Sequence, residues 1–410
     1  MPVLIFGYGT TGKSIESYLV NNNINYFIFD DNEETIVDKK KMFTLNNLDN
    51  IDLVYISPGI APNHSLYKEL RNKNIEIKTD IDLFFEKINY EKIISIGVTG
   101  TNGKTSFVTL VEEFLKNENL KTESVGNIGK SPISVIEEIN NSLEKTYLLI
   151  ELSSFQLFYS KKLVLDYGIL LNITEDHLDW HSNIDEYTKS KNKIYSFVKE
   201  SNNKISNVES DSMEKIYSSH LDYISKLIEK GFHENTILNF FKLIIQLLPH
   251  KEIIDKGFNF LLNQPNLEHR FEIIENSSHH IFINDSKSTN LASVQFAISK
   301  LNNLKINHDA NQMILILHGD NKGIDFSKLD LREVDTVFYT KNFKLLENDK
   351  IKKIKYKSLK DIKESLEKNL NTKSIVLFSC GGSSFTEFKN YKDRGIFFKN
   401  LVGNMALDHD

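Results

Sequence analysis

The chain has 410 residues, of which 26% are charged, and a formal net charge of −6 at pH 7. This length predicts two or three domains, and the dispersed charge argues against a nucleic-acid-binding surface. No apolar run approaches the roughly 20 residues of a membrane span, and no basic leader precedes the first strand, so we expect a soluble cytoplasmic protein. Cys380 is the single cysteine, which excludes disulfides within the chain and leaves oxygen or imidazole ligands for any metal.

Alternating strands and helices are predicted for residues 1–88. A strand over 3–6 leads into a glycine turn of the form G-x-G-x-x-G over 7–12 and then into a helix over 13–20. A second strand over 25–29 ends at Asp30, and a third over 53–56 is closed by a polar loop over 57–62. This pattern is Rossmann-like, and Asp30 suits a ribose hydroxyl. Taken alone, it leaves a nicotinamide-dependent oxidoreductase open.

The next region opens with a strand, a glycine-rich turn and a helix. Residues 93–105 read IISIGVTGTNGKT, and a helix is predicted over 106–116. The N–H groups of such a turn and helix start bind phosphates, Lys104 adds a cation, and the Thr105 hydroxyl can reach magnesium. Val98 stands where the general pattern has glycine, and glycines occur at Gly97 and Gly100 instead. The turn predicts ATP or GTP binding, with a tight strand-to-helix connection as the alternative.

Polar groups follow two further strands of this region, predicted over 148–152 and 167–173. Glu151 ends the first, where a buried carboxylate needs a cation such as magnesium; pairing with a lysine or helix capping is the alternative. The second leads into residues 174–179, where three acids and His177 either join this site or cap the next helix. Lys191 follows fourteen residues later, as a further site residue or as a solvated lysine on a helix. Residues 201–219 predict a loop or frayed helix, and 236–248 an amphipathic helix.

A third α/β region is predicted from His269 onward. Its strands are expected over 281–284, 313–317, 336–339 and 375–379, and its last helix over 385–394. Polar loops at three strand exits (284–290, 318–323 and 379–384) are placed to enclose a small polar ligand, and Asp285 with Lys287 suits ribose and phosphate contacts. Each loop alone is equally an ordinary turn. Arg270 and Arg394, two of four arginines in the chain, fall in these motifs, which favours bidentate contacts.

Together these motifs resemble those of the Mur ligase family, in order and across nearly the whole chain. The resemblance is carried by residues 99–105, 126–129 (GNIG), 151–157, 172–179, 269–271 and 284–290. Residues 126–129, residues 151–157 and the short N-terminal region favour the D-glutamate-adding ligases over the ligases that add later residues and over folylpolyglutamate synthases. The resemblance implies an α/β fold of three domains: a Rossmann-like UDP-sugar domain over 1–88, a central P-loop ATPase-like domain with a mainly parallel sheet over 89–267, and a Rossmann-like amino-acid domain over 268–410.

The resemblance also implies a reaction of peptidoglycan synthesis. ATP would phosphorylate the terminal carboxylate of UDP-N-acetylmuramoyl-L-alanine, and the amine of D-glutamate would attack the acyl phosphate and release phosphate. ATP and two Mg²⁺ ions would be the cofactors. We expect a monomer without nucleic-acid or membrane partners. A ligase of the same fold with another acceptor, such as a folate, and a nucleotide-binding regulator without catalysis stay as alternatives.

The resemblance assigns site residues by position. The ATP site would comprise Gly100, Thr101, Asn102, Gly103, Lys104, Thr105, His269, Arg270, Asp285 and Lys287. One magnesium would be held by Thr105 and Glu151, and a second by His177, bridged by Lys191 if that lysine is carbamylated. The UDP-sugar would contact Gly9, Thr10, Thr11, Asp30, Gly59 and Asn127. D-glutamate would contact Thr289, Lys322, Ser384 and Tyr391. The catalytic group would be Lys104, Asn127, Glu151, His177 and Lys191.

The chain also departs from the family pattern. Glu234 stands where Asn is expected after His233, Tyr391 where Phe is common, and Thr386 where Asp is common. Residues 194–231 form a shorter segment than usual, which is expected to lack peripheral strands of the central domain. These departures bear on the adenine contacts and on the D-glutamate pocket more than on the phosphate site.

Overall fold

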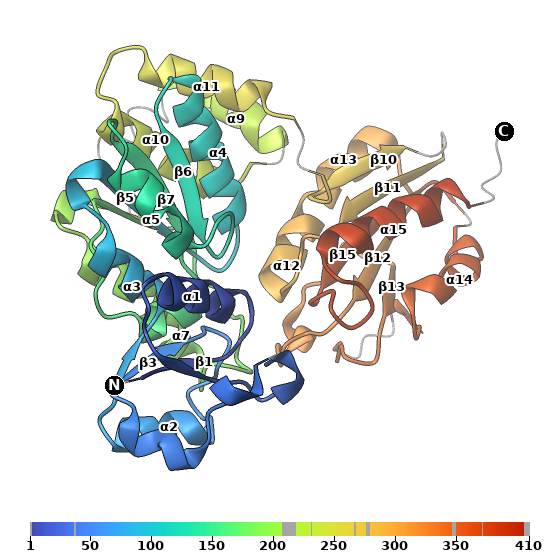
Figure 1. Ribbon diagram of the computed structural model, residues 1–410. Helices are drawn as coiled ribbons and strands as arrows, with labels where there is room; N and C mark the ends of the chain where they lie inside the picture. The colour runs from blue at the N-terminus through green and yellow to red at the C-terminus, as the bar shows by residue number, and fades with distance from the viewer. Residues whose placement is uncertain are drawn as a thin grey trace. The chain divides into compact units, whose positions relative to one another are not determined.

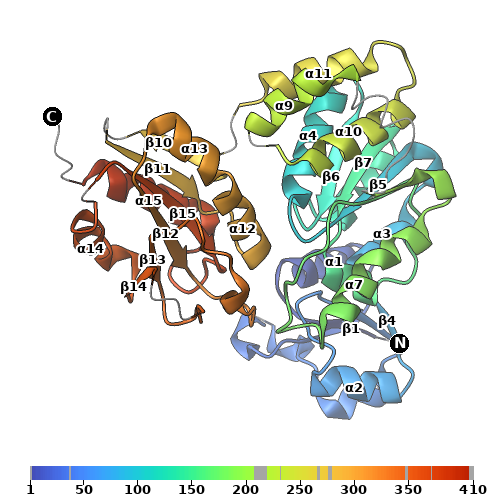
Figure 2. The same cartoon turned by 180° about the vertical axis from the view of Figure 1, so that it is seen from behind.

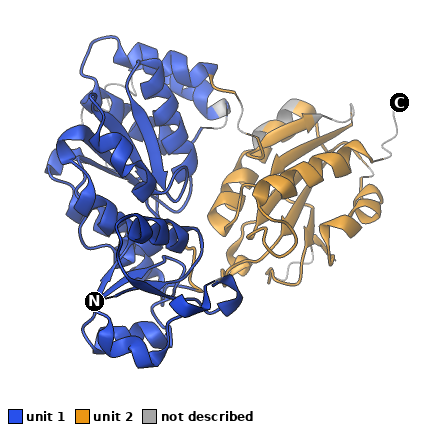
Figure 3. Cartoon of the chain, viewed as in Figure 1, with its two compact units in different colours: residues 1–173, 180–263 blue, residues 174–179, 264–410 orange. Residues whose placement is uncertain are grey.

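Three separate sheets organise the described part of the chain in the computed structural model (Figure 1). The structure describes residues 2–36, 38–206, 219–230, 232–265, 268–275, 279–346, 350–370 and 372–405, so most of the segment predicted as loop or frayed helix over 201–219 lies outside the described residues. The chain divides into two compact units, residues 1–173 with 180–263 and residues 174–179 with 264–410 (Figure 3).

The first sheet of unit 1 is parallel, with strand order β2-β1-β3-β4. Its elements are β1 Val3–Phe6, α1 Thr10–Asn21, β2 Tyr26–Phe29, β3 Leu53–Ile56, α2 Ser65–Asn72, β4 Glu76–Lys78 and α3 Asp80–Lys87. Because β2 and β3 lie on opposite sides of β1, the strand order reverses there, and the turns after β1 and β3 flank the place where ligands bind in such sheets.

Alternate residues of these strands face two different cores. Leu4 and Phe6 pack with Leu66 and Leu70 of α2, whereas Val3 and Ile5 pack with residues of α1. The second core continues through α3 into the central sheet, where it includes Ile93 and Ile150. A buried apolar cluster shared in this way ties the first two sheets into one unit.

The second sheet of unit 1 is also parallel, with strand order β6-β7-β5-β8-β9. Its strands are β5 Ile93–Thr99, β6 Thr122–Gly126, β7 Thr146–Glu151, β8 Tyr167–Leu170 and β9 Lys204–Ile205. The helices of this region are α4 Lys104–Asn117, α5 Ile136–Asn140, α6 Ser154–Tyr159, α7 Ile184–Asn192, α9 Leu221–Glu229, α10 Glu234–Leu247 and α11 Ile253–Asn263.

Helices cover both faces of this central sheet. Ile96 and Val98 of β5 pack with α4, α9, α10 and α11, which Figure 2 shows gathered on one side of β5–β7. Ile93 faces the other core, which contains residues of α3 and of the short helix Pro132–Val135. Strands buried on both faces explain why the sequence here reads as continuous apolar runs rather than as an alternating pattern.

Unit 2 contains the third sheet, in the order β10-β11-β15-β12-β13-β14, with only β10 antiparallel to its neighbour among the described strands. Its elements are β10 Glu272–Glu275, β11 His280–Asp285, α12 Leu291–Ser299, α13 Leu301–His308, β12 Gln312–His318, β13 Thr336–Tyr339, β14 Lys352–Lys355, α14 Lys363–Glu367, β15 Ser374–Gly381 and α15 Tyr391–Gly403. Ile281 and Ile283 pack toward α12, while Phe282 packs toward α15, so both faces are covered.

The predicted α/β fold class, with mainly parallel sheets, is confirmed. Each sheet lies within one of the three predicted domain ranges, while the boundaries at 88/89 and 267/268 stay a prediction. No helix in the described ranges has both the length and the apolarity needed to cross a bilayer.

Two predicted helices are misplaced. The last helix was expected over 385–394, but α15 begins only at Tyr391, because Asn390 caps it by accepting a hydrogen bond from the N–H of Asp393 at 2.9 Å. The first helix begins at Thr10 rather than at residue 13, so Thr10, Thr11 and Gly12 are already helical.

Candidate active site

The glycine-rich turn after β5 holds the backbone geometry expected of a phosphate-binding loop. Gly103 adopts a left-handed conformation with φ of 85° and forms the N-cap of α4. A side chain at this position would strain the backbone. Lys104 and Thr105 therefore start the helix, whose first N–H groups have no partner within the helix and can bind an anion.

Hydrogen bonds to Asn172, which lies two residues after the end of β8, hold this loop in place. Its carbonyl oxygen accepts a hydrogen bond from the N–H of Thr101 at 2.9 Å, and its side-chain amide exchanges hydrogen bonds with the backbone of Asn102 at 2.9 and 3.0 Å. The Thr101 hydroxyl also lies 2.8 Å from the Tyr187 hydroxyl of α7. Asn172 lay in a motif of the sequence without an assigned role, and nothing in the sequence marked Tyr187.

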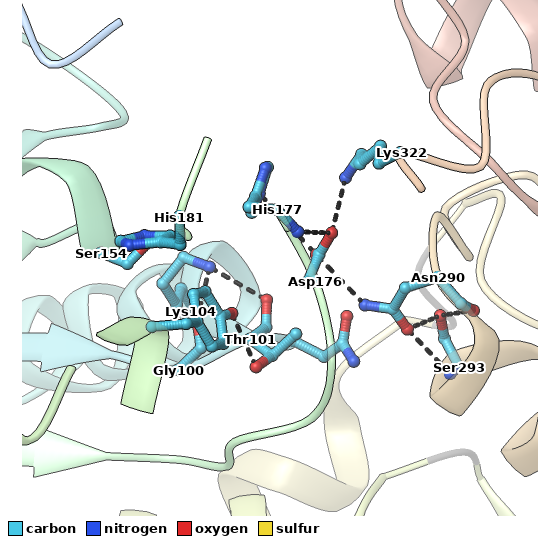
Figure 4. Close-up of polar contacts among 12 residues, drawn as sticks. Gly100, Thr101, Lys104, Ser154, Asp176, His177, His181, Asn290, Ser293 and Lys322 are labelled. Carbon is cyan, nitrogen blue, oxygen red and sulfur yellow. Dashed lines mark hydrogen bonds and ion pairs between the residues drawn. The ribbon is translucent and has the colours of Figure 1, made fainter. Parts of the chain in front are cut away.

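Two lysine ammonium groups converge on one carbonyl oxygen of this loop. Lys104 donates to the Gly100 carbonyl at 2.7 Å and to the Thr101 carbonyl at 3.0 Å, as Figure 4 shows. Lys191 donates to the same Gly100 carbonyl at 2.7 Å and is 2% exposed. Its burial overturns the alternative of a solvated lysine on a helix face. Two cations this close favour an anion beside the loop.

Glu151 is a buried carboxylate at the end of β7, next to the strand that leads into the loop. It pairs in register with Val98 of β5 and Gly126 of β6 and is 1% exposed. Its Oε1 accepts a hydrogen bond from the Asn127 side chain at 3.0 Å, whereas its buried Oε2 has no partner among the described residues. The alternatives of a lysine partner or a helix cap therefore find no support there.

The unpartnered Glu151 oxygen fits a magnesium site. Within the described ranges, His, Cys, Asp and Glu side chains nowhere gather in threes as a preformed metal centre. Magnesium does not need such a centre, because it is commonly bound by one or two carboxylates together with water and substrate phosphates. A buried carboxylate oxygen without a donor is stabilised most by a cation.

Beyond β7, a polar pair that the sequence did not reveal lies at the start of α6. The buried His181 Nε2 is 3.0 Å from the Ser154 hydroxyl, and the indole of Trp180 stacks on Phe155 at 4.4 Å. The only sequence signal for this pair is that His181 lies close to the polar segment 174–179. Its aromatic surroundings come from residues far apart in the chain.

Residues 174–179, which follow β8, group with unit 2. Asp176 is buried and lies 3.1 Å from the Lys322 ammonium and 3.4 Å from the Asn290 amide (Figure 4). Burial raises the pKa of Asp176, but Lys322 and His177 outweigh it and hold that pKa below its usual value. The acids of this segment do not cap α7, since Asn183 caps it. The predicted second magnesium site, with His177 and Lys191, joins residues of both units and stays a prediction.

The three glycines in the turn after β1 have different surroundings. A Cβ on Gly12 would meet the Gly7 carbonyl oxygen at 2.2 Å, so Gly12 allows α1 to pack against the turn. Gly7 has a φ of 93° and lies against Ser57, whose hydroxyl donates to the Gly7 carbonyl at 2.7 Å. Gly9, in contrast, faces open space. This is the division expected where the middle glycine lets a nucleotide approach the backbone.

Other predicted UDP-sugar residues border the same turns. Asp30, at the end of β2, accepts hydrogen bonds from the backbone N–H of Tyr8 at 2.6 Å and of Asn32 at 2.9 Å. Gly59, in the loop after β3, faces open space like Gly9. Thr10 and Thr11 form the first turn of α1. The predicted residues thus meet at the switch point of this sheet, except Asn127, which lies beside Glu151.

One predicted nucleotide residue of unit 2, Asp285, is a buried carboxylate with three hydrogen-bond donors. Asp285 accepts hydrogen bonds from the Ser288 hydroxyl at 2.5 Å, the Ser379 hydroxyl at 2.7 Å and the Phe271 N–H at 3.1 Å. Burial raises the pKa of Asp285, and burial lowers the pKa of the Arg270 guanidinium, although each of the two charges opposes the other's shift. Asp285 and Arg270 therefore stabilise each other electrostatically.

Two residues assigned to different ligands are neighbours in unit 2. The Lys287 ammonium lies 4.0 Å from the ring centroid of Tyr391, a cation–π contact that a phenylalanine at 391 could also make. His269 is 2% exposed, and its Nδ1 lies 2.9 Å from the side-chain amide nitrogen of Asn284. The buried ring therefore contacts the residue that directly precedes Asp285. Burial lowers the pKa of His269.

Arg394 joins the three predicted polar loops of unit 2. It is 0% exposed and donates to Ser286 Oγ at 3.0 Å, Ser286 O at 2.8 Å, His318 O at 3.2 Å and Gly382 O at 3.0 Å. These hydrogen bonds fix the exits of β11, β12 and β15, so its role is internal. Ser384, which is 5% exposed, and the half-buried Thr289 and Lys322 lie on these loops.

Around the expected adenine contacts, α10 begins at Glu234 with His233 as its N-cap, and the His233 side chain does not cap the helix. Gly231 of that motif lies outside the described residues. In the segment expected to lack peripheral strands, the structure describes the two-residue strand β9, and residues 207–218 lie outside the described residues, so that expectation stays a prediction.

The sequence of the chain is similar to those of known proteins. Residues 98–251 match the Mur ligase middle domain. The UDP-N-acetylmuramoylalanine–D-glutamate ligase of Francisella tularensis subsp. tularensis (strain SCHU S4) is 30% identical over 419 residues, which cover 98% of this chain and 96% of that protein. The ligase of the same name from subsp. mediasiatica (strain FSC147) is 31% identical, with the same coverage.

Solved structures share the fold across almost the full length. The UDP-N-acetylmuramate-alanine ligase MurC from Thermotoga maritima is 17% identical, with a TM-score of 0.51, and the match covers 98% of this chain and 99% of that one. The MurF ligase from Thermotoga maritima, solved in complex with ADP, is 15% identical, with a TM-score of 0.53 and coverage of 98% and 94%. By its full-length relatives and its central domain, the chain belongs to the Mur ligase family of ATP-dependent amide-forming ligases.

Proposed function

We propose that this protein is an ATP-dependent ligase that adds D-glutamate to UDP-N-acetylmuramoyl-L-alanine in peptidoglycan synthesis. The observation that carries the proposal is the phosphate loop beside Glu151, whose buried Oε2 has no partner among the described residues. That arrangement suits a magnesium-bound triphosphate, and the relatives at 30 and 31% identity are named for this reaction. The alternative of a nicotinamide-dependent oxidoreductase leaves the loop and Glu151 without a task.

The first step activates a carboxylic acid. A carboxylate oxygen of the L-alanyl group attacks the γ-phosphorus of ATP, the bond to the β,γ-bridging oxygen breaks, and ADP leaves. Lys104 and the N–H groups at the start of α4 would hold the phosphates, while Thr105 and Glu151 would hold magnesium, which neutralises charge on the transferred phosphoryl group. Asn127, hydrogen-bonded to Glu151, would orient the substrate carboxylate next to that site.

The second step forms the amide bond. The uncharged amine of D-glutamate attacks the acyl carbon, phosphate leaves, and the nitrogen loses a proton. Thr289, Lys322, Ser384 and Tyr391 would bind the acceptor, and Gly9, Thr11, Asp30 and Gly59 would bind the uridine end of the other substrate. Lys322, whose ammonium group contacts Asp176, would attract a carboxylate of the acceptor.

A phosphate-release assay tests the proposal. We expect ATP turnover only when UDP-N-acetylmuramoyl-L-alanine and D-glutamate are both present, and no turnover with L-glutamate at the same concentration. The UDP-sugar substrate with L-alanine, L-lysine or meso-diaminopimelate as acceptor serves as a control for other Mur ligase reactions. Turnover with a folate substrate and L-glutamate would support the alternative ligase. ATP binding without ADP formation under every combination would support a regulator.

A further inference from the structure

A buried histidine and a glutamate without any role in the proposed chemistry form a pair in unit 2. His318 is the last residue of β12 and is 2% exposed, and its Nε2 lies 2.8 Å from Oε2 of Glu387. Tyr356 stacks on the imidazole at 6.2 Å, and Phe388 approaches it edge-on at 5.8 Å. The buried Nδ1 has no hydrogen-bond partner among the described residues, so the histidine's polar contact there is directed at Glu387.

The Glu387 side chain connects its own turn to the end of β12 and to residues 358–359. Besides His318, its carboxylate accepts hydrogen bonds from the Ser358 hydroxyl at 2.5 Å and from the backbone N–H of Leu359 at 3.2 Å. A carboxylate only accepts hydrogen bonds, so three donors suit it, and the imidazole proton must lie on Nε2. Burial lowers the pKa of His318, and the hydrogen bonds outweigh burial to lower the pKa of Glu387. The pair is therefore a neutral imidazole donating to an ionised carboxylate.

The pair connects the two loops that carry predicted acceptor contacts. The N–H groups of Glu387 and Phe388 both donate to the Ser384 carbonyl, at 3.1 and 2.9 Å, so Ser384 and Glu387 belong to one turn. On the other side, His318 is followed directly by the loop that leads to Lys322. Asp320 and Ser383 join the same loops by two backbone hydrogen bonds of 3.1 and 2.7 Å. Side chains and backbone thus link these loops at two separate points.

We propose that His318 and Glu387 are positioning residues for the amino-acid acceptor, which set the spacing between the Lys322 ammonium and the Ser384 hydroxyl. This inference rests on the proposed function. An acceptor with two carboxylates needs its binding groups at a fixed separation, and a turn held by a charge-assisted hydrogen bond keeps that separation better than one held by backbone contacts alone. Neither residue touches the acceptor; both act through Ser384 and Lys322.

Steady-state kinetics of the full-length protein test the inference. Glu387→Gln places an amide nitrogen against one of the three donors. His318→Leu removes the donor to Glu387 and puts an apolar side chain in the place of the buried imidazole. We expect either change to raise KM for D-glutamate roughly tenfold or more, because a hydrogen bond to a charged group is lost. KM for ATP and for the UDP-sugar substrate should stay within about twofold of wild type, since those sites are left intact.

Two matched variants complete the design. His318→Gln retains an N–H donor that can reach the position of the imidazole Nε2, so it should restore most of the affinity for D-glutamate that His318→Leu loses. Glu364→Gln, at an exposed position of α14, should leave all three KM values unchanged.

Three results would overturn the inference. One is an unchanged KM for D-glutamate in both Glu387→Gln and His318→Leu, in an assay where the wild type works. Another is an equal loss for all three substrates together with a lower melting temperature, which would indicate general structural support only. The third is a failure of His318→Gln to differ from His318→Leu. A wild type without any acceptor-dependent phosphate release would instead remove the proposed function itself.

Discussion

The phosphate loop of unit 1 and the loop cluster of unit 2 handle buried charge in opposite ways. In unit 1, the Glu151 carboxylate keeps one buried oxygen without a partner among the described residues, and two ammonium groups share the Gly100 carbonyl. In unit 2, Asp285 accepts hydrogen bonds from three donors, and the Arg394 guanidinium makes four hydrogen bonds to backbone and hydroxyl groups.

Among the described residues, the Glu151 region has the unpaired buried group expected of a ligand-binding site, whereas the groups around Asp285 and Arg394 are paired as expected of a rigid scaffold. Buried groups that lack partners lower stability, so they persist where binding or catalysis uses them. Saturated buried groups give rigidity, because removing one partner leaves the others unsatisfied. Substitutions at the phosphate loop and at Glu151 should therefore mainly reduce activity, and a substitution of Arg394 should mainly reduce stability.

The largest effect on activity is expected from Lys104→Ala. Removing the ammonium group should lower the rate of phosphate release about 10⁴-fold, because the transferred phosphoryl group loses a cation that stabilises its charge. The melting temperature should change little, because the Lys104 side chain is only partly buried. Lys116→Ala, at an exposed position near the end of the same helix, is the matched control. Undiminished turnover by Lys104→Ala would refute the role of the loop.

Glu151→Gln should uncouple activity from stability. The amide cannot replace a carboxylate as a magnesium ligand, so phosphate release should fall about 10³-fold and the magnesium dependence should weaken. Without ligands, the variant should be as stable as wild type or more stable, because a buried charge with an unpartnered oxygen is removed. Thermal unfolding and a magnesium titration measure both effects, with Glu113→Gln on the exposed face of α4 as the control. A strongly destabilised Glu151→Gln protein would argue that the carboxylate is structural.

Arg394→Met tests the other side of the comparison. The change leaves several buried carbonyl groups without donors and should cost about 4 kcal/mol in the free energy of unfolding of the C-terminal part. Urea unfolding followed by fluorescence measures the loss. Arg332→Met removes an arginine that is 86% exposed and should have no measurable effect on that transition. Equal stability of the two variants would mean that the three loops hold together without Arg394.

Another buried carboxylate of unit 1, Asp80, should make the stability of the protein depend on pH. Asp80, at the start of α3, has an Oδ1 without a partner among the described residues, and burial raises its pKa from 3.8 to about 6. The folded state therefore holds this proton more tightly than the unfolded state. The stability contributed by the protonated form is complete below about pH 4 and is lost progressively up to about pH 6, by roughly 3 kcal/mol in all.

Asp80→Asn should remove this dependence. Urea midpoints of wild type should decrease from pH 4.5 to pH 6.5 relative to the variant, and the variant should be the more stable protein at pH 7. Parallel curves for the two proteins across this range would show that Asp80 is ionised in the folded state without penalty.

Much of unit 1 could be predicted from the sequence because its signals are local. The turn before Lys104 and the glycines from Gly7 to Gly12 identify themselves, since only certain residues tolerate a left-handed turn or a close backbone approach. The positions of Glu151 and Asp30 at strand ends follow from the apolar runs before them. The start of α15 could not be predicted in this way, because the cap at Asn390 outweighs a helical pattern that begins several residues earlier.

The order of strands, turns and helices, and the polar groups at each strand exit, follow from local patterns of residues. Which of these groups meet depends on the folded arrangement. Arg394 reaches three loops, Lys191 shares a carbonyl with Lys104, and His318 is paired with Glu387. These contacts join residues distant in the chain, and they depend on strand order and register, which no local pattern encodes.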